Sequence, residues 1–263
     1  TFMIYLKIRK RGFKMIIDIH AHIGIVKGKF NMPPEFQLEG MKKYNIDYAL
    51  ISNIACGYGN YELEGNIEAV KTARENKDKL GVMLWCAPSE TADIKAFEKL
   101  YTDNRDIIKG LKIHPDISGI RADSEAFYPY LSLAEKYSLP VLFHTQDTDF
   151  SKVRYVLNAS EKFPDVKMIL GHMSLASDYS EALEAVKNHK NIYADTAWVK
   201  SDIIERAKNS CAEDKIMFGT DSPIGGPDTY ADPEYYPEYY KKTGTEAEKV
   251  MYKNAIRLFG LEL

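Results

Sequence analysis

The sequence has few cysteines, and the ones it has are far apart. Only Cys56, Cys86 and Cys211 occur among the 263 residues, and none of them forms a CxxC pair. An odd, sparse set of this kind argues against a disulfide framework. It favours a protein of the reducing cytoplasm.

The sequence also lacks long apolar runs and an excess of positive charge. No apolar stretch approaches the roughly 18 residues that a membrane-spanning helix needs. The formal net charge is −3 and the sequence pI is about 6.1, whereas nucleic acids and anionic membranes are bound by basic surfaces. We therefore expect neither partner and look for a small-molecule substrate.

The N-terminal residues Thr1–Lys14 are basic and apolar, and they precede a methionine, Met15. They contain neither the long apolar stretch nor the small-residue cleavage site of a secretory signal. We interpret residues 1–14 as an extension, either native or a remnant ahead of a natural start at Met15, and residues 15–263 as one domain. The alternative is an additional strand or arm packed on that domain.

Short β-branched runs alternate with amphipathic helical patterns along the chain. Such alternation indicates parallel strands joined by right-handed crossovers. Eight repeats, with no GxGxxG after the first run, favour a closed (β/α)₈ TIM barrel of the α/β class over an open doubly wound sheet. The predicted strands are Met15–His20, Asp47–Asn53, Leu80–Cys86, Gly110–His114, Pro140–His144, Val166–His172, Asn191–Asp195 and Ile216–Asp221.

One segment, Asp221–Val250, departs from this alternation. It is rich in proline, glycine and tyrosine and is long for a strand-to-helix connection. In a barrel it would lie over the mouth, where it would act as a lid that contacts substrate. The alternative is a surface loop or a contact between subunits of a homodimer, for which tyrosines are well suited.

Five of the six histidines fall at or near the C-terminal ends of predicted strands, where parallel barrels build their active sites. His20 and His22 in DIHAH share a face because strand side chains alternate. The later strands contribute His114, His144, His172 and Asp221. The sixth histidine, His189 in the polar context NHKN, is expected at the surface.

This combination of side chains suits a catalytic metal. Imidazole nitrogen and carboxylate oxygen bind Zn²⁺ and similar ions, and catalytic sites keep one position for water. A metal lowers the pKa of that water toward ~7. Asp221 beside it could accept the water proton and pass it to a leaving group. A lone histidine at a strand end is more often a core or rim residue, but the ordered set favours a metal site.

At these residues the sequence resembles the amidohydrolase superfamily. The closest likeness is to its amidohydrolase-related branch, which also contains metal-dependent decarboxylases of the aminocarboxymuconate-semialdehyde type. The resemblance runs from Met15 to the C-terminus. The matching segments are IDIHAH (Ile17–His22), GLKIHPDISGIRAD (Gly110–Asp123), LPVLFHT (Leu139–Thr145), ILGHMS (Ile169–Ser174), IYADTA (Ile192–Ala197), IMFGTDSP (Ile216–Pro223) and NAIRLFGL (Asn254–Leu261).

The resemblance implies roles for the matched residues. It makes His20, His22, His144 and Asp221 the ligands of a divalent metal, with Asp221 also the general base. His172 is implied either as a further ligand or as an acid/base that orients the water. We expect one ion, most simply Zn²⁺, although Mn²⁺, Fe²⁺ and Co²⁺ occupy similar sites.

The fourth predicted strand carries Lys112 and His114, which share a face because they are two residues apart. Binuclear members of the superfamily have a carboxylated lysine or a glutamate on this strand, so a carboxylated Lys112 would bridge two metals. We favour an unmodified cation that binds a substrate carboxylate or pairs with Asp18. His114 is expected to line the pocket, and Arg121 to contact a substrate anion; a solvated loop arginine is the alternative.

Three further residues are expected to support the site. Asp18 lies two residues before His20, and we expect it to orient a ligand or pair with a base from deeper in the barrel. Asp195 ends the seventh predicted strand and could act in the same way. Trp198 either forms a wall of the pocket or only packs.

The leading hypothesis is a metal-dependent hydrolase that uses activated water on a C–N or C–O bond of a small amide, lactone or ester. The alternative is a non-oxidative decarboxylase of a small unsaturated or aromatic acid on the same scaffold. A TatD-like nuclease would need a glutamate on the fourth strand and a basic mouth. A non-catalytic binding protein would keep its function after Asp221→Asn.

Overall fold

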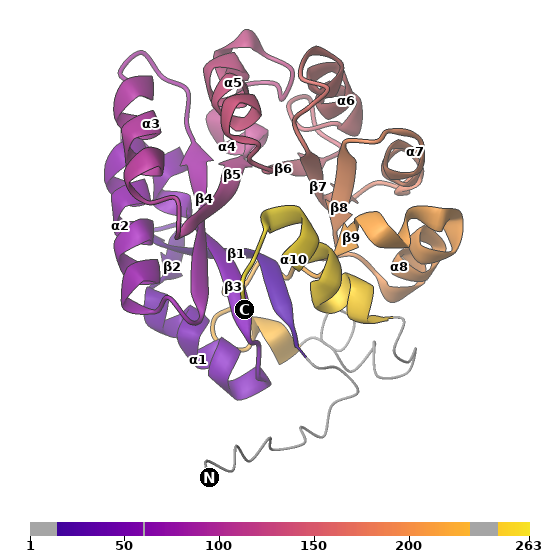
Figure 1. The fold of residues 1–263 in the computed structure, drawn as a ribbon, viewed down its shortest axis with the longest axis horizontal. Helices are drawn as coiled ribbons and strands as arrows, with labels where there is room; N and C mark the ends of the chain where they lie inside the picture. The colour runs from indigo at the N-terminus through magenta and orange to yellow at the C-terminus, as the bar shows by residue number, and fades with distance from the viewer. Residues whose placement is uncertain (1–14, 60, 232–246) are drawn as a thin grey trace.

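The computed structural model describes residues 15–59, 61–231 and 247–263 (Figure 1). The predicted extension at residues 1–14 and the centre of the tyrosine-rich segment, residues 232–246, lie outside the described residues. Among the described helices, none combines the length and apolar character needed to cross a membrane.

Eight parallel strands form the centre of the structure, and each corresponds to a predicted strand. They follow one another around the sheet in sequence order. Their bounds are β1 Ile17–Val26, β3 Tyr48–Asn53, β4 Leu80–Cys86, β5 Ile108–Ile113, β6 Val141–Gln146, β7 Met168–Leu175, β8 Ile192–Asp195 and β9 Ile216–Met217. The last strand is shorter than predicted, although the chain stays hydrogen-bonded to β1 as far as Ser222.

Hydrogen bonds between β1 and the segment after β9 close the sheet. The N–H of Ile19 donates to the carbonyl of Phe218 at 3.0 Å. Farther along, the N–H of Asp221 donates to His20 O and that of His22 donates to Ser222 O, both at 2.7 Å. The predicted (β/α)₈ barrel is thereby confirmed, and its closing seam runs through the backbone of three predicted site residues.

Helices surround the strands as an outer layer (Figure 1). Local signals set several of their ends: Asp93 caps α3 by accepting from the N–H groups of Lys95 and Ala96, both at 3.0 Å. Within the described residues the α-helices are α1 Pro34–Tyr44, α2 Glu62–Glu75, α3 Ile94–Asp103, α4 Pro115–Ser118, α5 Tyr128–Tyr137, α6 Val153–Lys162, α7 Ser180–Asn188, α8 Ser201–Ala207 and α10 Asn254–Phe259.

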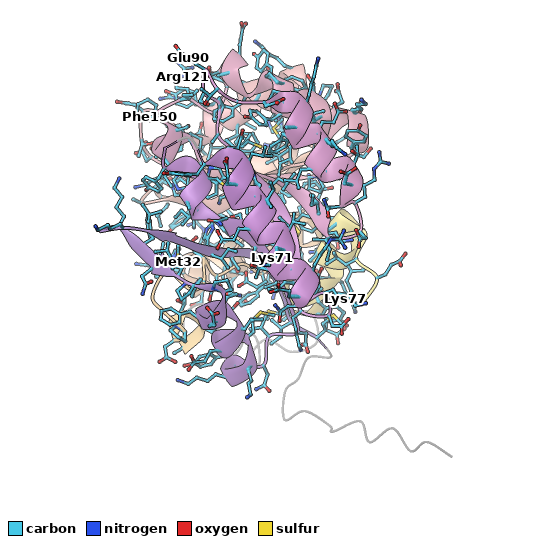
Figure 2. The ribbon with its side chains drawn as sticks, turned by 90° about the vertical axis from the view of Figure 1, so that its left-hand side faces the viewer. Met32, Lys71, Lys77, Glu90, Arg121 and Phe150 are labelled. Carbon is cyan, nitrogen blue, oxygen red and sulfur yellow. The ribbon has the colours of Figure 1, made fainter. Side chains whose placement is uncertain are left out.

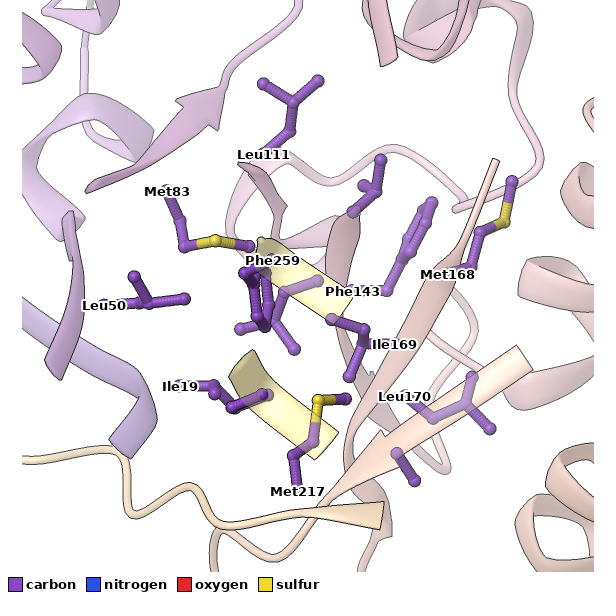
Figure 3. Close-up of a cluster of buried hydrophobic side chains, with 14 of the residues drawn as sticks. Ile19, Leu50, Met83, Leu111, Phe143, Met168, Ile169, Leu170, Met217 and Phe259 are labelled. Atoms are coloured by element: carbon purple, nitrogen blue, oxygen red, sulfur yellow. The ribbon is translucent and has the colours of Figure 1, made fainter. Parts of the chain in front are cut away.

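A packed core fills the barrel. Figure 3 shows side chains from different strands pointing toward one another, and Phe259 of α10 joins them. This cluster includes Ile19, Leu50, Met83, Ile169 and Met217, each at most 1% exposed. Full burial of such a side chain contributes roughly 1.5–3 kcal/mol to stability. The polar residues at the strand ends therefore stand on a rigid apolar base.

A short hairpin at the mouth was not predicted. Strand β2, Phe30–Met32, pairs antiparallel with the end of β1, with Gly24 opposite Met32 and Val26 opposite Phe30. Gly24 has a φ of 124°, and a Cβ there would lie 2.3 Å from Oδ1 of Asn53, so only glycine fits this close approach. The hairpin carries Phe30 to the edge of the barrel mouth.

Candidate active site

Six aromatic rings form a closed circuit at the barrel mouth. The five strand-end histidines are all in it, and the sixth member is Trp85 from β4, which the sequence analysis did not identify. Centroid distances around the circuit are 5.2 Å for His20–His22, 6.2 Å for His22–Trp85, 5.7 Å for Trp85–His114, 3.8 Å for His114–His144, 4.8 Å for His144–His172 and 4.8 Å for His172–His20.

One compact polar group consists of His20, His22 and Asp221. Oδ1 of Asp221 lies 2.8 Å from Nε2 of His22 and 3.4 Å from Nε2 of His20. One ligand atom from each residue lies within 4.8 Å of the others, and all three residues are buried. Two imidazole nitrogens and a carboxylate oxygen converging in a buried site fit a divalent metal such as Zn²⁺.

Partners behind the rings fix how the first two histidines point. Nδ1 of His20 lies 2.7 Å from Oδ2 of Asp195, and Nδ1 of His22 lies 2.9 Å from Oγ of Ser52. Such bonds leave each Nε2 directed at the common centre, as in many metal sites. Oδ1 of Asp195 also accepts from the backbone N–H groups of His172 and Ala197, at 2.9 and 3.0 Å.

His172 contributes a third imidazole nitrogen beside those of His20 and His22. Its Nδ1–H donates to the carbonyl of Ala197 at 3.1 Å, which leaves the Nε2 lone pair available. His172, Trp198 and Asp221 have φ values of 65°, 57° and 66°. Left-handed non-glycine residues cost about 1–3 kcal/mol each and cluster at functional sites. Nε2 is thus the atom through which His172 would bind a metal or move a proton.

His144 lies next to His172 but belongs to a different polar group. Its Nε2 is 3.3 Å from Oε1 of Gln146 and 3.4 Å from Oδ2 of Asp116. Its neighbours within ligand distance are His114 and Asp116, not His20, His22 or Asp221. The structure therefore places His144 beside the group formed by His20, His22 and Asp221 and not within it. The one sequence signal for Asp116 was its place two residues after His114.

His114 stacks face to face on His144, with an angle of 9° between the ring planes. Burial lowers the pKa of both imidazoles well below the ordinary histidine value, so two neutral rings are stacked. Nδ1 of His114 accepts from the N–H of Ile117 at 3.3 Å and caps helix α4. The expectation that His114 lines the pocket agrees with this position.

Lys112 contacts the ring circuit at His20 and is completely buried. Its Nζ lies 2.6 Å from Nε2 of His20. Burial lowers the pKa of Lys112 to about 8, while Asp221 and Asp195 oppose that shift. The expected alternative of a Lys112–Asp18 pair is not what the structure shows.

Asp18 does not face the ring of His20. The pairing of β1 with β3 shifts register between Asp18 and Ala21, and such a shift interrupts the alternation of side chains. The Asp18 carboxylate instead accepts from Thr220 Oγ1 at 2.5 Å, Tyr230 Oη at 2.8 Å and the backbone N–H of His20 at 3.0 Å. Burial raises the pKa of Asp18 to about 7. Its position joins β1 to the segment after β9.

A cavity of about 490 Å³ opens above the ring circuit. Its floor is polar and consists of His22, Lys112, His114, Asp116, His144, Gln146, His172 and Asp221. Its walls are mainly apolar and consist of Phe30, Ile54, Tyr58, Ile117, Leu175, Trp198 and Ile224. Ile224 comes from the start of the predicted lid segment.

Two predicted residues lie elsewhere. Arg121 is not among the residues that line the cavity; it pairs with Asp123 at 2.7 Å, and its guanidinium lies 4.1 Å from the ring centroid of Tyr155. Figure 2 shows it at the periphery, near Phe150. It therefore matches the alternative of a surface loop arginine. His189 lies at the C-terminal end of α7, also outside the cavity lining.

Solved structures of similar fold include enzymes with different activities. They are 2,6-dihydroxybenzoate decarboxylase complexed with 2,6-dihydroxybenzoate (TM-score 0.72, 15% identity, 95% of this chain and 100% of that chain), 5-carboxyvanillate decarboxylase from Novosphingobium aromaticivorans complexed with manganese and a nitrobenzoic acid (0.68, 13%, 95% and 97%), and 4-oxalomesaconate hydratase from Rhodopseudomonas palustris (0.62, 15%, 94% and 96%). At these identities the likeness shows the fold.

No curated protein sequence matches the chain. The model of a protein family described as amidohydrolase, however, matches residues 17–261. That match spans every described strand and all of the predicted site residues. The chain therefore belongs to the amidohydrolase family, as the ordered motifs predicted.

Proposed function

We propose that this protein is a metal-dependent decarboxylase that releases CO₂ from a small, planar aromatic or unsaturated acid. The proposal rests on the division of the cavity. Its walls, including Phe30, Tyr58 and Trp198, are suited to a flat apolar body, whereas its floor carries imidazoles, Lys112 and Asp221. A substrate with one apolar end and one anionic end matches both surfaces.

Loss of its carboxylate removes a negative charge from the substrate, and the apolar walls of the cavity favour that loss of charge. In the reaction the C–C bond to the carboxylate breaks, its electron pair stays on the substrate carbon, and that carbon takes a proton. CO₂ leaves as a neutral molecule. If the apolar walls limit the access of water to the bound acid, its charged ground state is less favoured than it is in solution.

The residues that would hold the metal are His20, His22 and Asp221, with His144 and His172 beside them. A bound divalent ion supplies Lewis-acid stabilisation of negative charge on a substrate oxygen. The protein itself would orient the acid end and hold the proton that the substrate carbon takes. Asp221 and His172 are the titratable groups of the floor that could accept a proton and pass it to that carbon.

The solved structures of similar fold support the proposal, because two of those compared are decarboxylases of substituted benzoic acids and one of these is complexed with manganese. The likeness is one of fold, so it raises the expectation without fixing the reaction.

Hydrolysis of a small amide, lactone or ester is the second candidate, and the state of Asp221 favours it. Burial alone would raise the pKa of Asp221, but the hydrogen bond from His22 and the nearby imidazoles hold it well below the ordinary value. The carboxylate is then an anion at neutral pH, ready to accept a proton from water.

The test compares the two reactions in one protein preparation. Purified protein loaded with Zn²⁺ or Mn²⁺ is incubated in D₂O with dihydroxybenzoates and muconate-like acids, and separately with lactones and amides. We expect CO₂ release with one deuterium at the vacated carbon, lost on chelation and restored by the metal. Lactone or amide hydrolysis without CO₂ release would contradict decarboxylation and support the second candidate. No turnover in either panel contradicts both.

A further inference from the structure

The ammonium group of Lys112 is hydrogen-bonded to Nε2 of His20, the nitrogen through which His20 would bind a metal. Nδ1 of His20 is engaged with the Asp195 carboxylate at 2.7 Å, and Nε2 is engaged with Lys112 Nζ at 2.6 Å. An ionised carboxylate only accepts hydrogen bonds, so the ring proton of His20 lies on Nδ1. Lys112 therefore donates to the Nε2 lone pair, which is the pair that a metal would take.

The charges around Lys112 match those around a bound cation. Asp195 and Asp221 are both buried, and both attract the Lys112 ammonium. Oδ1 of Asp221 lies 3.4 Å from the same Nε2 of His20 that Lys112 contacts. Buried carboxylates need a compensating charge or donor. Lys112 supplies that charge from within the barrel, on strand β5.

We propose that Lys112 competes with the metal for Nε2 of His20 and so sets the metal affinity of the site. Lys112 has to give up its bond to His20 before His20 can act as a ligand. The inference rests on the proposed function only in taking His20 as a metal ligand, and it does not depend on which substrate the enzyme uses.

A carboxylated Lys112 makes the opposite prediction. Carboxylation would turn the side chain into an anion that binds metal, so its loss would weaken binding or remove one of two ions. Competition instead predicts that loss of the side-chain donor strengthens binding and leaves the number of ions unchanged. The direction in which metal affinity changes when the Lys112 side chain is replaced therefore distinguishes competition from carboxylation.

The test is metal affinity, measured by competition between the metal-free protein and a chelator of known affinity for Zn²⁺ and then Mn²⁺. Lys112→Met removes the donor and keeps an apolar side chain of similar length. We expect it to bind at least about tenfold more tightly than wild type, since a charge-assisted hydrogen bond and a like-charge neighbour are both lost. Lys109→Met, a partly exposed position on the same strand, is the matched control and should bind like wild type.

A second variant and a second measurement guard against failure to fold. Lys112→Gln keeps a neutral donor, and we expect its affinity to lie between wild type and Lys112→Met. The rise in Tm on adding Zn²⁺ should be larger in Lys112→Met than in wild type. Equal affinities in wild type and both Lys112 variants overturn the inference alone, as does weaker binding in Lys112→Met. If wild type binds neither metal, the proposed function fails as well.

Discussion

The indole N–H of Trp198 donates to Oδ2 of Asp221 at 2.9 Å, while the other carboxylate oxygen of Asp221 faces Nε2 of His22 at 2.8 Å. One carboxylate oxygen of Asp221 therefore accepts from Trp198, and the other faces the histidines. Trp198 and Asp221 both have left-handed backbones, so the chain accepts strain at both ends of this bond. The bond holds the carboxylate in the orientation that points one oxygen toward the histidines.

Trp198→Phe removes this donor and keeps most of the ring. A hydrogen bond to a charged acceptor is worth about 1.5–3 kcal/mol, so we expect kcat to fall roughly tenfold to a hundredfold with a smaller change in KM. Steady-state kinetics on the metal-loaded enzyme measures this split. A rise in KM alone would show that Trp198 is only a wall of the cavity.

Asp221→Asn tests the central carboxylate. It removes both the proposed metal ligand and the proposed proton acceptor, so we expect turnover to fall by at least about 10³-fold, together with weaker Zn²⁺ binding. Far-UV circular dichroism should still show a folded barrel, because the backbone bond from Asp221 N–H to His20 O is retained. Retained turnover would contradict the role of Asp221, whereas ligand binding without turnover in both wild type and variant would favour a non-catalytic binding protein.

Glu62, remote from the site, predicts how stability depends on pH. Burial raises the pKa of Glu62, while the N–H of Ala87 and the hydroxyl of Tyr130 oppose the shift. The folded state then keeps a proton that the unfolded state has released. Stability from this group is therefore greatest below about pH 4.3 and falls as pH rises through the raised pKa.

Glu62→Gln mimics the protonated form, and Oε1 can still accept from Ala87 and Tyr130. Urea unfolding at several pH values between 4 and 8 should show the variant gaining stability relative to wild type as pH rises. Glu64→Gln, exposed on the same helix, is the control. A Glu62→Gln difference that does not change with pH would contradict the prediction.

Tyr230→Phe tests the junction between β1 and the segment after β9. Tyr230 donates to Asp18 at 2.8 Å and accepts from Gln37 Nε2 at 2.7 Å, and all three residues are buried. The variant leaves Asp18 and Gln37 without this partner, which should lower the free energy of unfolding by about 1–3 kcal/mol. Each kcal/mol lost lowers Tm by roughly 2–4 °C. Thermal unfolding measures the loss.

Tyr44→Phe makes the same chemical change at the surface. Tyr44 donates to Asp228, and that bond is exposed. We expect a loss within about 0.5 kcal/mol. Equal losses in Tyr44→Phe and Tyr230→Phe would show that the junction at Asp18 does not stabilise the fold.

Much of the fold and part of the site could be predicted from the sequence because they follow from periodicity. Eight parallel strands place their ends on one side of the barrel, so His20, His114, His144 and His172 had to lie near one another. The family was also predicted, from the order of the motifs. Zinc, a homodimer and a cytoplasmic location stay predictions.

The features that could not be predicted depend on local geometry that does not follow the repeating pattern of strand side chains. The register shift after Asp18 turned its carboxylate toward Thr220, whereas strict alternation predicted the face of His20. Hairpin β2 is only three residues long, too short for an alternating pattern. Arg121 found its partner two residues away in Asp123, and no pattern of spacing reveals such a choice.

The closing seam of the barrel passes through the backbone of His20, His22 and Asp221. The first two of these residues are made early on the ribosome and the third only after most of the chain. A nascent chain can therefore hold two histidines for a long time without a complete ligand set. The hydrogen bond from Asp221 N–H to His20 O helps to join the first strand of the barrel to the last. Binding of a metal through all three residues would therefore require a chain whose barrel has closed.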